Sequence, residues 1–167
     1  TVFAAADLLQ ARALVVLDPE IASVTPESVA ALARPALAGE ADFVSPAYAR
    51  HPLDGLLVTQ VVRPVFRAAY GVALQVPLAG GFGCSGRFAA RCLGAPAWAS
   101  RGLRLAIDLW ISGMAAEDTL RAAEVGLGPR RLTARSRPAV AALVPQGLDA
   151  LFTCLRLQEG RWTARAH

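Results

Sequence analysis

Short apolar runs alternate with longer stretches of helical spacing along this chain, a pattern typical of α/β proteins. The run "ALVVLD" at 13–18 predicts a buried parallel strand that ends in the carboxylate of Asp18. A helix is predicted over 25–34, and a second short strand over 41–46. The chain therefore opens with a strand, a helix and a strand.

Local signals mark the ends of two predicted helices. Thr25 is suited to cap the first of them, and Pro26 to occupy its first position. Proline is costly inside a helix, so this helix should end near Arg34, before Pro35. Gly71 should end the helix that precedes it.

The second half of the chain predicts a similar alternation, with element boundaries defined to within a few residues. The predicted elements are a helical stretch over 55–71 with a kink or break at Pro64, a strand over 72–77, a helix over 87–93, a helix within 104–123 whose first turn holds Asp108, a strand over 122–128, and a helix over 140–157 interrupted by Pro145.

Composition narrows the class of protein. The chain has 167 residues, of which 54% are hydrophobic, so one domain with a sizeable core is expected. Its basic residues are all arginines, scattered rather than striped, and only 7% of residues are aromatic, which disfavours nucleic-acid binding. Charged residues interrupt every long apolar stretch, so no membrane span is predicted. Three cysteines without a C-x-x-C pair, and no secretory signal, predict reduced thiols in the cytoplasm.

The stretch "PLAGGFGCSG" at 77–86 contains a formal G-x-G-x-x-G pattern. In a dinucleotide-binding protein this pattern forms a turn between a strand and a helix, and an acid follows about 20 residues later. Such a turn would make the chain part of a nicotinamide-dependent oxidoreductase. Pro77 argues against it, because it would remove a hydrogen-bond donor from the approaching strand.

Acidic residues supply two further candidates for functional sites, and for each of them a purely structural role is also possible. Asp18 and Glu20 would lie on one side of an extended chain and could hold a divalent ion. Alternatively, Asp18 caps a turn and Glu20 is solvated. Asp108, set between apolar residues, is either a partly desolvated functional acid or a partner of the helix dipole.

Polar residues gather in "SPAYARHPLDG" at 45–55, between a predicted strand and an apolar helix. Arginine is suited to bidentate recognition of phosphate or carboxylate, so this block could bind an anionic ligand. It could equally be a surface loop that caps the next helix. The block contains Tyr48, Arg50, His51 and Asp54.

Taken in order, these stretches resemble the family-2-like glycosyltransferases of the GT-A fold, near the glucosylglycerate and mannosylglycerate synthases. The "SPAYARHPLDG" block and the P-x-x-G-G-F-G-x-S stretch carry most of the resemblance, which runs from about residue 13 to 155. It implies an α/β fold with a mixed sheet flanked by helices, forming part of the GT-A fold. It also implies a nucleotide-sugar donor, a divalent metal, and a small acceptor such as glycerate or a related hydroxy acid or sugar.

The resemblance assigns roles to particular residues. Asp18 and Glu20 fall on the metal-binding acidic motif for Mg²⁺ or Mn²⁺, and Asp108 falls on a catalytic acid near the acceptor hydroxyl. The acceptor region falls on Tyr48, Arg50, His51, Asp54, Thr59, Gly80 and Gly81.

Three departures from the family pattern accompany these assignments. Gly81 stands where an acid is usual, and Arg130 and Arg131 stand in a block that commonly ends in a metal-binding histidine. The two arginines could instead neutralise the donor diphosphate directly. The family's nucleotide-binding strands, which normally precede the acidic motif, have no counterpart before Asp18. We therefore expect residues 1–167 to form the acceptor-side portion of a transferase, with a non-catalytic binding protein as the alternative and a homo-oligomer left open.

Overall fold

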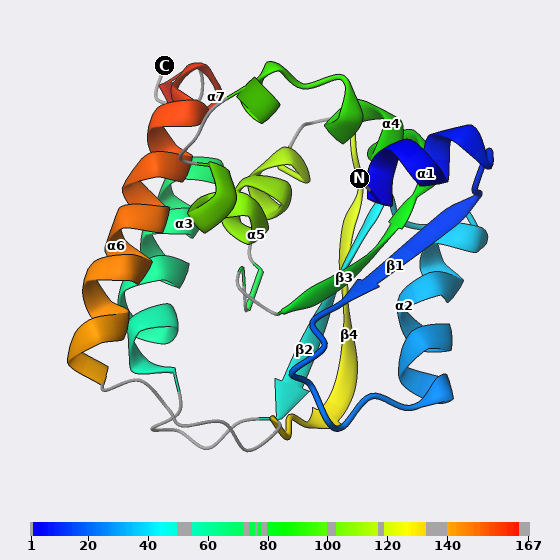
Figure 1. Cartoon of the computed structure of the whole chain (residues 1–167), viewed down its shortest axis with the longest axis horizontal. Helices are drawn as coiled ribbons and strands as arrows, with labels where there is room; N and C mark the ends of the chain where they lie inside the picture. The colour runs from blue at the N-terminus through cyan, green and yellow to red at the C-terminus, as the bar shows by residue number, and fades with distance from the viewer. Residues whose placement is uncertain are drawn as a thin grey trace.

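The computed structural model describes residues 2–49, 55–71, 74–75, 77, 80–99, 103–116, 119–132 and 140–163. Figure 1 shows the order of its helices and strands. They are α1 (Val2–Leu8), β1 (Ala13–Leu17), α2 (Pro26–Leu37), β2 (Phe43–Ala49), the π-helix η1 (Val58–Val62), α3 (Arg63–Tyr70), β3 (Gly81–Ser85), α4 (Gly86–Leu93), the 3₁₀-helix η2 (Pro96–Ala99), α5 (Leu103–Met114), β4 (Ala122–Pro129), α6 (Val140–Leu157) and α7 (Glu159–Thr163).

The four strands form one mixed sheet in the order β1-β3-β2-β4, which confirms the predicted fold class. β3 runs antiparallel to both of its neighbours, and β2 and β4 are parallel. β1, β2 and β4 therefore point in one direction and β3 in the other. The prediction of a strand over 13–18 was correct, but the prediction that it is parallel was wrong, because its only partner among the described strands, β3, runs antiparallel to it.

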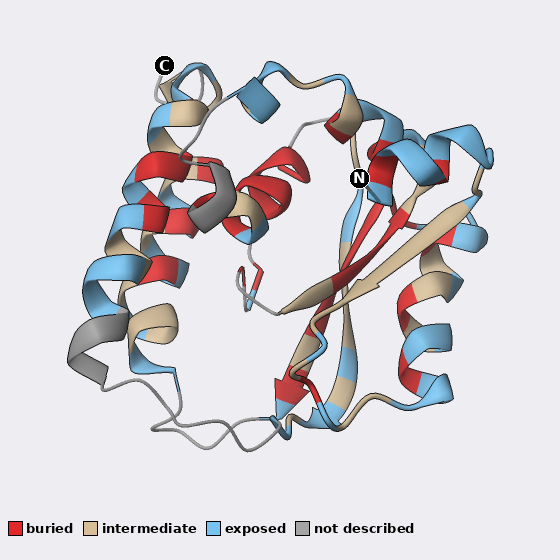
Figure 2. Ribbon diagram, viewed as in Figure 1, coloured by how far each residue is buried: buried red, intermediate tan, exposed pale blue. Residues whose placement is uncertain are grey.

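Helices cover the sheet on both faces. In Figure 1, α2 lies on one side of the sheet, and α5, α3 and α6 lie on the other. A small apolar cluster around Leu32 and Val44 joins α2 to the sheet. A larger cluster, which includes Phe43, Phe82 and Trp110, joins the opposite face to the remaining helices. Figure 2 shows buried residues along the centre of the sheet and on the facing sides of the helices.

The start of α2 follows its sequence signals, but its end does not. Thr25 caps the helix by accepting a hydrogen bond from the Ser28 backbone N–H, and Pro26 is the first helical residue. The predicted stop before Pro35 was wrong, since α2 continues to Leu37. Pro35 lies in the last turn, where its missing N–H removes only one helical hydrogen bond and the following residues close the end.

The middle of the chain forms two helical pieces, as expected around Pro64. The π-helix η1 passes directly into α3, and Pro64 lies in the first turn of α3. Gly71 ends α3 in the left-handed conformation, with a φ of 68°. In the last third, α5 ends at Met114, so the helix predicted within 104–123 is shorter than that range.

The glycine-rich stretch is a strand and not a loop, which overturns the interpretation as a dinucleotide fingerprint. Gly81–Ser85 forms β3 in the interior of the sheet, and the strand expected over 72–77 does not appear in its described residues Leu74, Gln75 and Pro77. A Cβ on Gly83 would collide with the backbone carbonyl of Leu32 in α2. Gly83 therefore permits close packing of helix on sheet, and the pattern does not cradle a phosphate.

Elsewhere the predicted elements are present. Helix α4 matches the range 87–93 within one residue, and β4 covers 122–128. The helix predicted over 140–157 is present as α6, but the predicted interruption at Pro145 was wrong, because α6 continues through that residue as a single helix. None of the described helices is both long enough and apolar enough to cross a bilayer.

Candidate functional site

One edge of the sheet collects the polar residues that the sequence singled out. Asp18 follows β1, Tyr48 lies near the end of β2, and Arg130 follows β4. Because β3 runs in the opposite direction, Gly80, the residue before it, lies at the same edge. The carboxyl ends of parallel strands are where α/β sheets commonly bind ligands, so this edge is the candidate site.

Asp18 is held in a turn. Its backbone N–H donates to the Gly80 carbonyl at 2.8 Å, and its Oδ1 accepts a 2.8 Å hydrogen bond from the Glu20 backbone N–H. The Ile21 N–H then donates to the Asp18 carbonyl at 3.1 Å. Asp18 and Glu20 therefore do not alternate along an extended strand, as one sequence-based interpretation required. The turn leaves the second carboxylate oxygen of Asp18 facing Gly80.

Arg130 approaches the same point from the end of β4, the strand at the opposite edge of the sheet from β1. A Cβ placed on Gly80 would lie 2.8 Å from Arg130 Nη2 and 3.4 Å from Asp18 Oδ2. The guanidinium carbon lies 5.7 Å from the centre of the Tyr48 ring, a cation–π arrangement. Arg130 Nε is buried and has no hydrogen-bond partner among the described residues. The guanidinium thus lies over an aromatic ring, and its Nε–H is free to donate to a ligand.

The segment that carries Arg130 is attached to the turn after β1. The Ala22 N–H donates to the Arg131 carbonyl at 2.8 Å, and the Arg131 N–H donates to Ser23 Oγ at 3.1 Å. Ile21 and Leu132 form an isolated antiparallel bridge. Arg131 itself is exposed. Of the two predicted donor-binding arginines, Arg130 is therefore the one whose side chain the structure places at the site.

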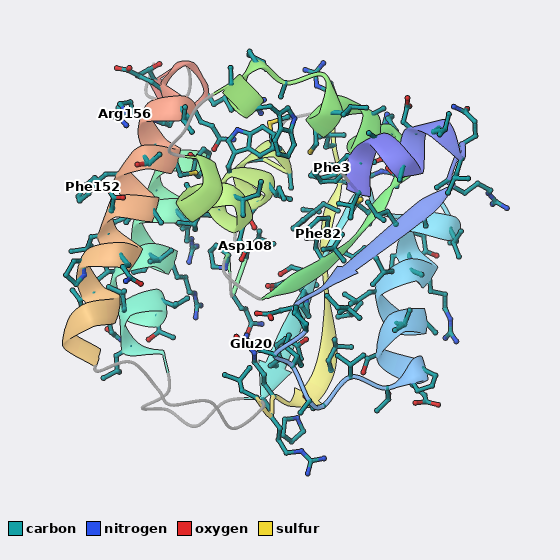
Figure 3. The ribbon with its side chains drawn as sticks, in the orientation of Figure 1. Phe3, Glu20, Phe82, Asp108, Phe152 and Arg156 are labelled. Atoms are coloured by element: carbon teal, nitrogen blue, oxygen red, sulfur yellow. The ribbon has the colours of Figure 1, made fainter. Side chains whose placement is uncertain are left out.

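Asp108, carried by α5, is the third charged residue near Asp18 and Arg130. It lies more than one turn into that helix, so its predicted place in the first turn was wrong. Asp108 is exposed to solvent, yet the surrounding protein partially desolvates its carboxyl group. This desolvation is the main cause that raises the pKa of Asp108; the negative charge of Asp18 raises it further, and Arg130 opposes the shift. Figure 3 shows Asp108 and Glu20 in the middle of the molecule, carried by α5 and by the segment after β1.

The predicted acceptor residues have separate outcomes. Arg50, His51 and Asp54 lie outside the described residues. Tyr48 and Gly80 lie at the site, whereas Gly81 is paired with Leu17 inside the sheet.

Thr59 is half-buried in η1, apart from the glycine stretch with which it was grouped. Its hydroxyl donates to the carbonyls of Gly55 and Leu56, both at 3.3 Å. It lines a hollow of about 600 Å³ together with Arg63, Pro64, Arg67 and Ala68. Nothing in these contacts connects Thr59 to Asp18 or Arg130.

A buried acid that the sequence patterns did not single out joins three strand ends at the opposite end of the sheet from the site. Asp42, just before β2, accepts hydrogen bonds from Arg87 Nε and Nη2 at 3.1 and 2.6 Å, from Ser85 Oγ at 3.1 Å, and from the Arg121 N–H at 3.0 Å. Burial by itself raises the pKa of Asp42, but these hydrogen bonds outweigh it and hold the pKa below its ordinary value. Ser85, in the stretch "CSGR", also caps α4. A serine before a helix is the one local signal in the sequence for this group of residues.

A divalent cation suits the donor set at this edge. In the part of the chain that the structure describes, no three histidine, cysteine or acidic side chains gather as a complete metal cage. Asp18 and Glu20 offer two carboxylates, and Mg²⁺ is commonly held by one or two carboxylates together with substrate phosphates and water. The residues present therefore fit a cation that a phosphorylated ligand helps to bind.

Comparison with known proteins supports the fold. No protein-family model and no curated protein match this chain. Solved structures of glucosyl-3-phosphoglycerate synthase from Mycobacterium tuberculosis do match. The complex with Mn²⁺, UDP and phosphoglyceric acid has a TM-score of 0.64 at 22% identity, covering 87% of this chain and 48% of that one. The complex with Mg²⁺ and UDP has a TM-score of 0.63 at 24% identity, covering 87% and 49%.

These matches confirm the predicted resemblance at the level of the fold. The sheet and its helices form part of a GT-A glycosyltransferase fold. The chain spans about half the length of the solved structures that it matches.

Proposed function

We propose that this chain is the acceptor-side part of a GT-A glycosyltransferase, which moves a sugar from a nucleotide-diphospho-sugar to a small hydroxylated acceptor. The observation that carries the proposal is the convergence of Asp18, Asp108 and Arg130 at one sheet edge. The fold supports it, because the matching structures were solved with UDP, Mn²⁺ or Mg²⁺, and phosphoglyceric acid. Glycerate, its phosphate or a related hydroxy acid is the acceptor class that we expect.

The donor diphosphate would be bound by charge from two directions. Asp18 and Glu20 would hold Mg²⁺ or Mn²⁺, which, when bound, offsets the negative charge that grows on a departing diphosphate. Arg130 would donate to phosphate oxygens, a pairing that suits the planar guanidinium. The buried Nε of Arg130 has no partner among the described residues, and the guanidinium lies over the Tyr48 ring. Arg131, which is exposed, would contribute long-range attraction at most.

Asp108 would act on the acceptor. A carboxyl group with a raised pKa is a better proton acceptor than an ordinary aspartate when it is ionised. From α5, it would accept a hydrogen bond from the attacking hydroxyl and orient that hydroxyl toward the sugar. Tyr48 and Gly80 would border the same space, and we retain Arg50, His51 and Asp54 as proposed acceptor contacts.

A non-catalytic binding protein is the second candidate. One observation favours it: the carboxylates described at the site do not amount to three metal ligands. Such a protein would bind diphosphate through Arg130 without transferring a sugar. The two candidates differ in a single measurable outcome, which is the formation of a glycosylated acceptor.

The test measures sugar transfer from UDP-glucose to 3-phosphoglycerate with Mn²⁺, by UDP release and by mass spectrometry of the product. It should be run with the complete gene product and the 167-residue chain in parallel. We expect Asp108→Asn to lower turnover about 10²-fold or more without lowering Tm, because it removes the proton acceptor. Asp7→Asn, which changes an exposed acid in α1, is the matched control.

Metal binding is tested separately by calorimetry with Mn²⁺ and pyrophosphate. Asp18→Asn should lose most of the Mn²⁺-dependent affinity, whereas Asp7→Asn should retain it. Full turnover in Asp108→Asn would remove that residue from the reaction. Pyrophosphate binding without product from any nucleotide sugar would support the non-catalytic alternative.

A further inference from the structure

A buried serine on α5 joins that helix to the segment that leads into β3. Ser112 Oγ donates a 2.9 Å hydrogen bond to the carbonyl of Pro77, and both residues are almost completely removed from solvent. Figure 1 shows this segment between α5 and the start of β3. A serine hydroxyl inside a helix can bond back to the carbonyl four residues earlier, but here it bonds across to another part of the chain. The hydroxyl therefore ties α5 to the segment.

The same segment is held at two further points, both on the sheet. The Gln75 N–H donates to Glu124 Oε1 at 2.7 Å, which ties the segment to β4. The Gly80 carbonyl accepts the 2.8 Å hydrogen bond from the Asp18 N–H, which ties it to the end of β1. Ser112 thus links α5 to a segment that is anchored to both outer strands of the sheet, and one of those anchors is a residue of the candidate site.

Asp108 and Ser112 lie on one face of α5, because residues four apart in a helix are neighbours on its surface. Ser112 contacts the segment before β3. One turn earlier, Asp108 lies near Asp18 and Arg130, whose charges act on its carboxyl group. A movement of α5 relative to the segment would therefore move Asp108 relative to the proposed phosphate site.

The other hydrogen bonds from α5 to neighbouring elements lead away from the site. Within the part of the chain that the structure describes, the Trp110 carbonyl accepts from Gln158 Nε2 at 3.1 Å, and Met114 Sδ accepts from Arg161 Nη2 at 3.1 Å. Both bonds join α5 to the C-terminal helices. Among the described residues, the Ser112 hydroxyl makes the one hydrogen bond that joins α5 to the segment before β3.

We propose that Ser112 is a positioning residue for Asp108: its hydrogen bond to Pro77 holds α5 against the segment before β3 and so sets the place of Asp108 beside Asp18. The inference rests on the proposed function, in which Asp108 orients the acceptor hydroxyl. In this role Ser112 contacts neither donor nor acceptor and acts only through α5. A buried bond suits the task, because a hydrogen bond in a nonpolar interior is stronger than one in water.

The test compares two substitutions of the serine. Ser112→Ala removes the donor to the buried Pro77 carbonyl, whereas Ser112→Thr keeps a hydroxyl at the same position. Asp42→Ala removes hydrogen bonds at the opposite end of the sheet and controls for a general loss of stability. For each variant of the complete gene product, kcat and KM for UDP-glucose are measured with 3-phosphoglycerate and Mn²⁺, well below Tm. Amide hydrogen exchange is measured in the same protein.

We expect Ser112→Ala to lower kcat about 10- to 100-fold and to change the KM for UDP-glucose less than about threefold, because a small misplacement of Asp108 slows the reaction more than it weakens donor binding. Ser112→Thr should recover most of the rate, and Asp42→Ala should lower Tm with little change in kcat. In the Asp108→Asn background, Ser112→Ala should lower kcat no further, since the residue that it positions is already lost.

Hydrogen exchange tests the same bond without any need for activity. The Asp18 N–H, which donates to the Gly80 carbonyl, should exchange about tenfold faster in Ser112→Ala, because the segment loses one of its anchors. The Gly86 N–H, which donates to the Arg12 carbonyl at the other end of the β1–β3 pair, should exchange at its wild-type rate.

Three outcomes overturn the inference. They are an unchanged kcat in Ser112→Ala, effects of Ser112→Ala and Asp108→Asn on kcat that simply multiply, and equal exchange at Asp18 in Ser112→Ala and the wild type. Failure of the proposed function is distinguishable, because then the wild type itself transfers no sugar, while exchange at Asp18 still reports whether Ser112 holds the segment.

Discussion

Gly80→Ala tests whether the space between Asp18 and Arg130 is the phosphate site. Gly80 has a φ of 74°, and a methyl group there would lie 2.8 Å from Arg130 Nη2 and 3.4 Å from both Asp18 Oδ2 and Ile21 Cδ1. Asp18 is held by its turn hydrogen bonds, whereas Arg130 Nη2 is the far end of a long side chain. The guanidinium is therefore the group that must move.

Gly80→Ala should have two separable effects, one on the stability of the fold and one on phosphate binding. Alanine in the left-handed conformation costs about 1–2 kcal/mol of stability relative to glycine. Gly39→Ala should have the same cost, because Gly39 has a φ of 71° and a methyl group on it would have no other atom within 4 Å. Displacement of Arg130 is specific to Gly80. A hydrogen bond from a charged donor contributes about 1.5–3 kcal/mol, so its loss should weaken phosphate binding about 10- to 100-fold.

Thermal denaturation and calorimetry measure these two parts. Both alanine variants should lower Tm by about 2–8 °C, a shift that follows from their shared conformational cost. Only Gly80→Ala should weaken the binding of Mn²⁺ and pyrophosphate. If Gly80→Ala binds pyrophosphate as tightly as the wild type, Arg130 does not contact phosphate. If Gly39→Ala weakens binding equally, the effect is one of general stability.

Two predictions concern the sheet that carries the site. Asp42→Ala should lower the free energy of unfolding in urea by about 2 kcal/mol at pH 7, because the Ser85 hydroxyl and the Arg121 N–H lose their acceptor, whereas the exposed Glu40→Ala should change it little. The pKa of Asp42 is lowered on folding, so its stabilisation is present above the unfolded value of about 3.9 and is lost as the pH falls through the folded value. The difference between wild type and Asp42→Ala should therefore shrink below about pH 4, and a constant difference would contradict this assignment. Gly83→Ala should destabilise the fold by about 3 kcal/mol in thermal denaturation, since its methyl would meet the Leu32 carbonyl, and Gly126→Ala, in open space, is its control.

Elements with local signals could be predicted from the sequence. Thr25 and Pro26 mark the start of α2, and Gly71 marks the end of α3, because capping depends on residues within one turn of the helix. Pro35 was misread for a tertiary reason. Packing of α2 on the sheet outweighs the loss of a single hydrogen bond in its last turn, and the sequence alone does not give that packing.

The glycine-rich stretch could not be assigned from its pattern. Gly83 is required because the Leu32 backbone approaches it, and Gly86 because the Ala11 carbonyl does. Both contacts join residues that are far apart in the sequence. A pattern of glycines reports where a side chain would not fit, but it does not say whether the neighbour is a phosphate, a helix or a strand.

The residues proposed for the site stand out in the sequence, but their arrangement in space could not be predicted from it. Asp18 and Arg130 meet only because β3 is inserted antiparallel between β1 and β2, which brings Gly80 and the ends of three strands to one edge. The result is a site in which the carboxylates of Asp18 and Asp108 lie near the guanidinium of Arg130. Asp18 already raises the pKa of Asp108, so negative charge at this edge is in excess. A divalent cation bound at Asp18 and Glu20 would relieve that excess, and we expect it to favour the ionised, proton-accepting form of Asp108.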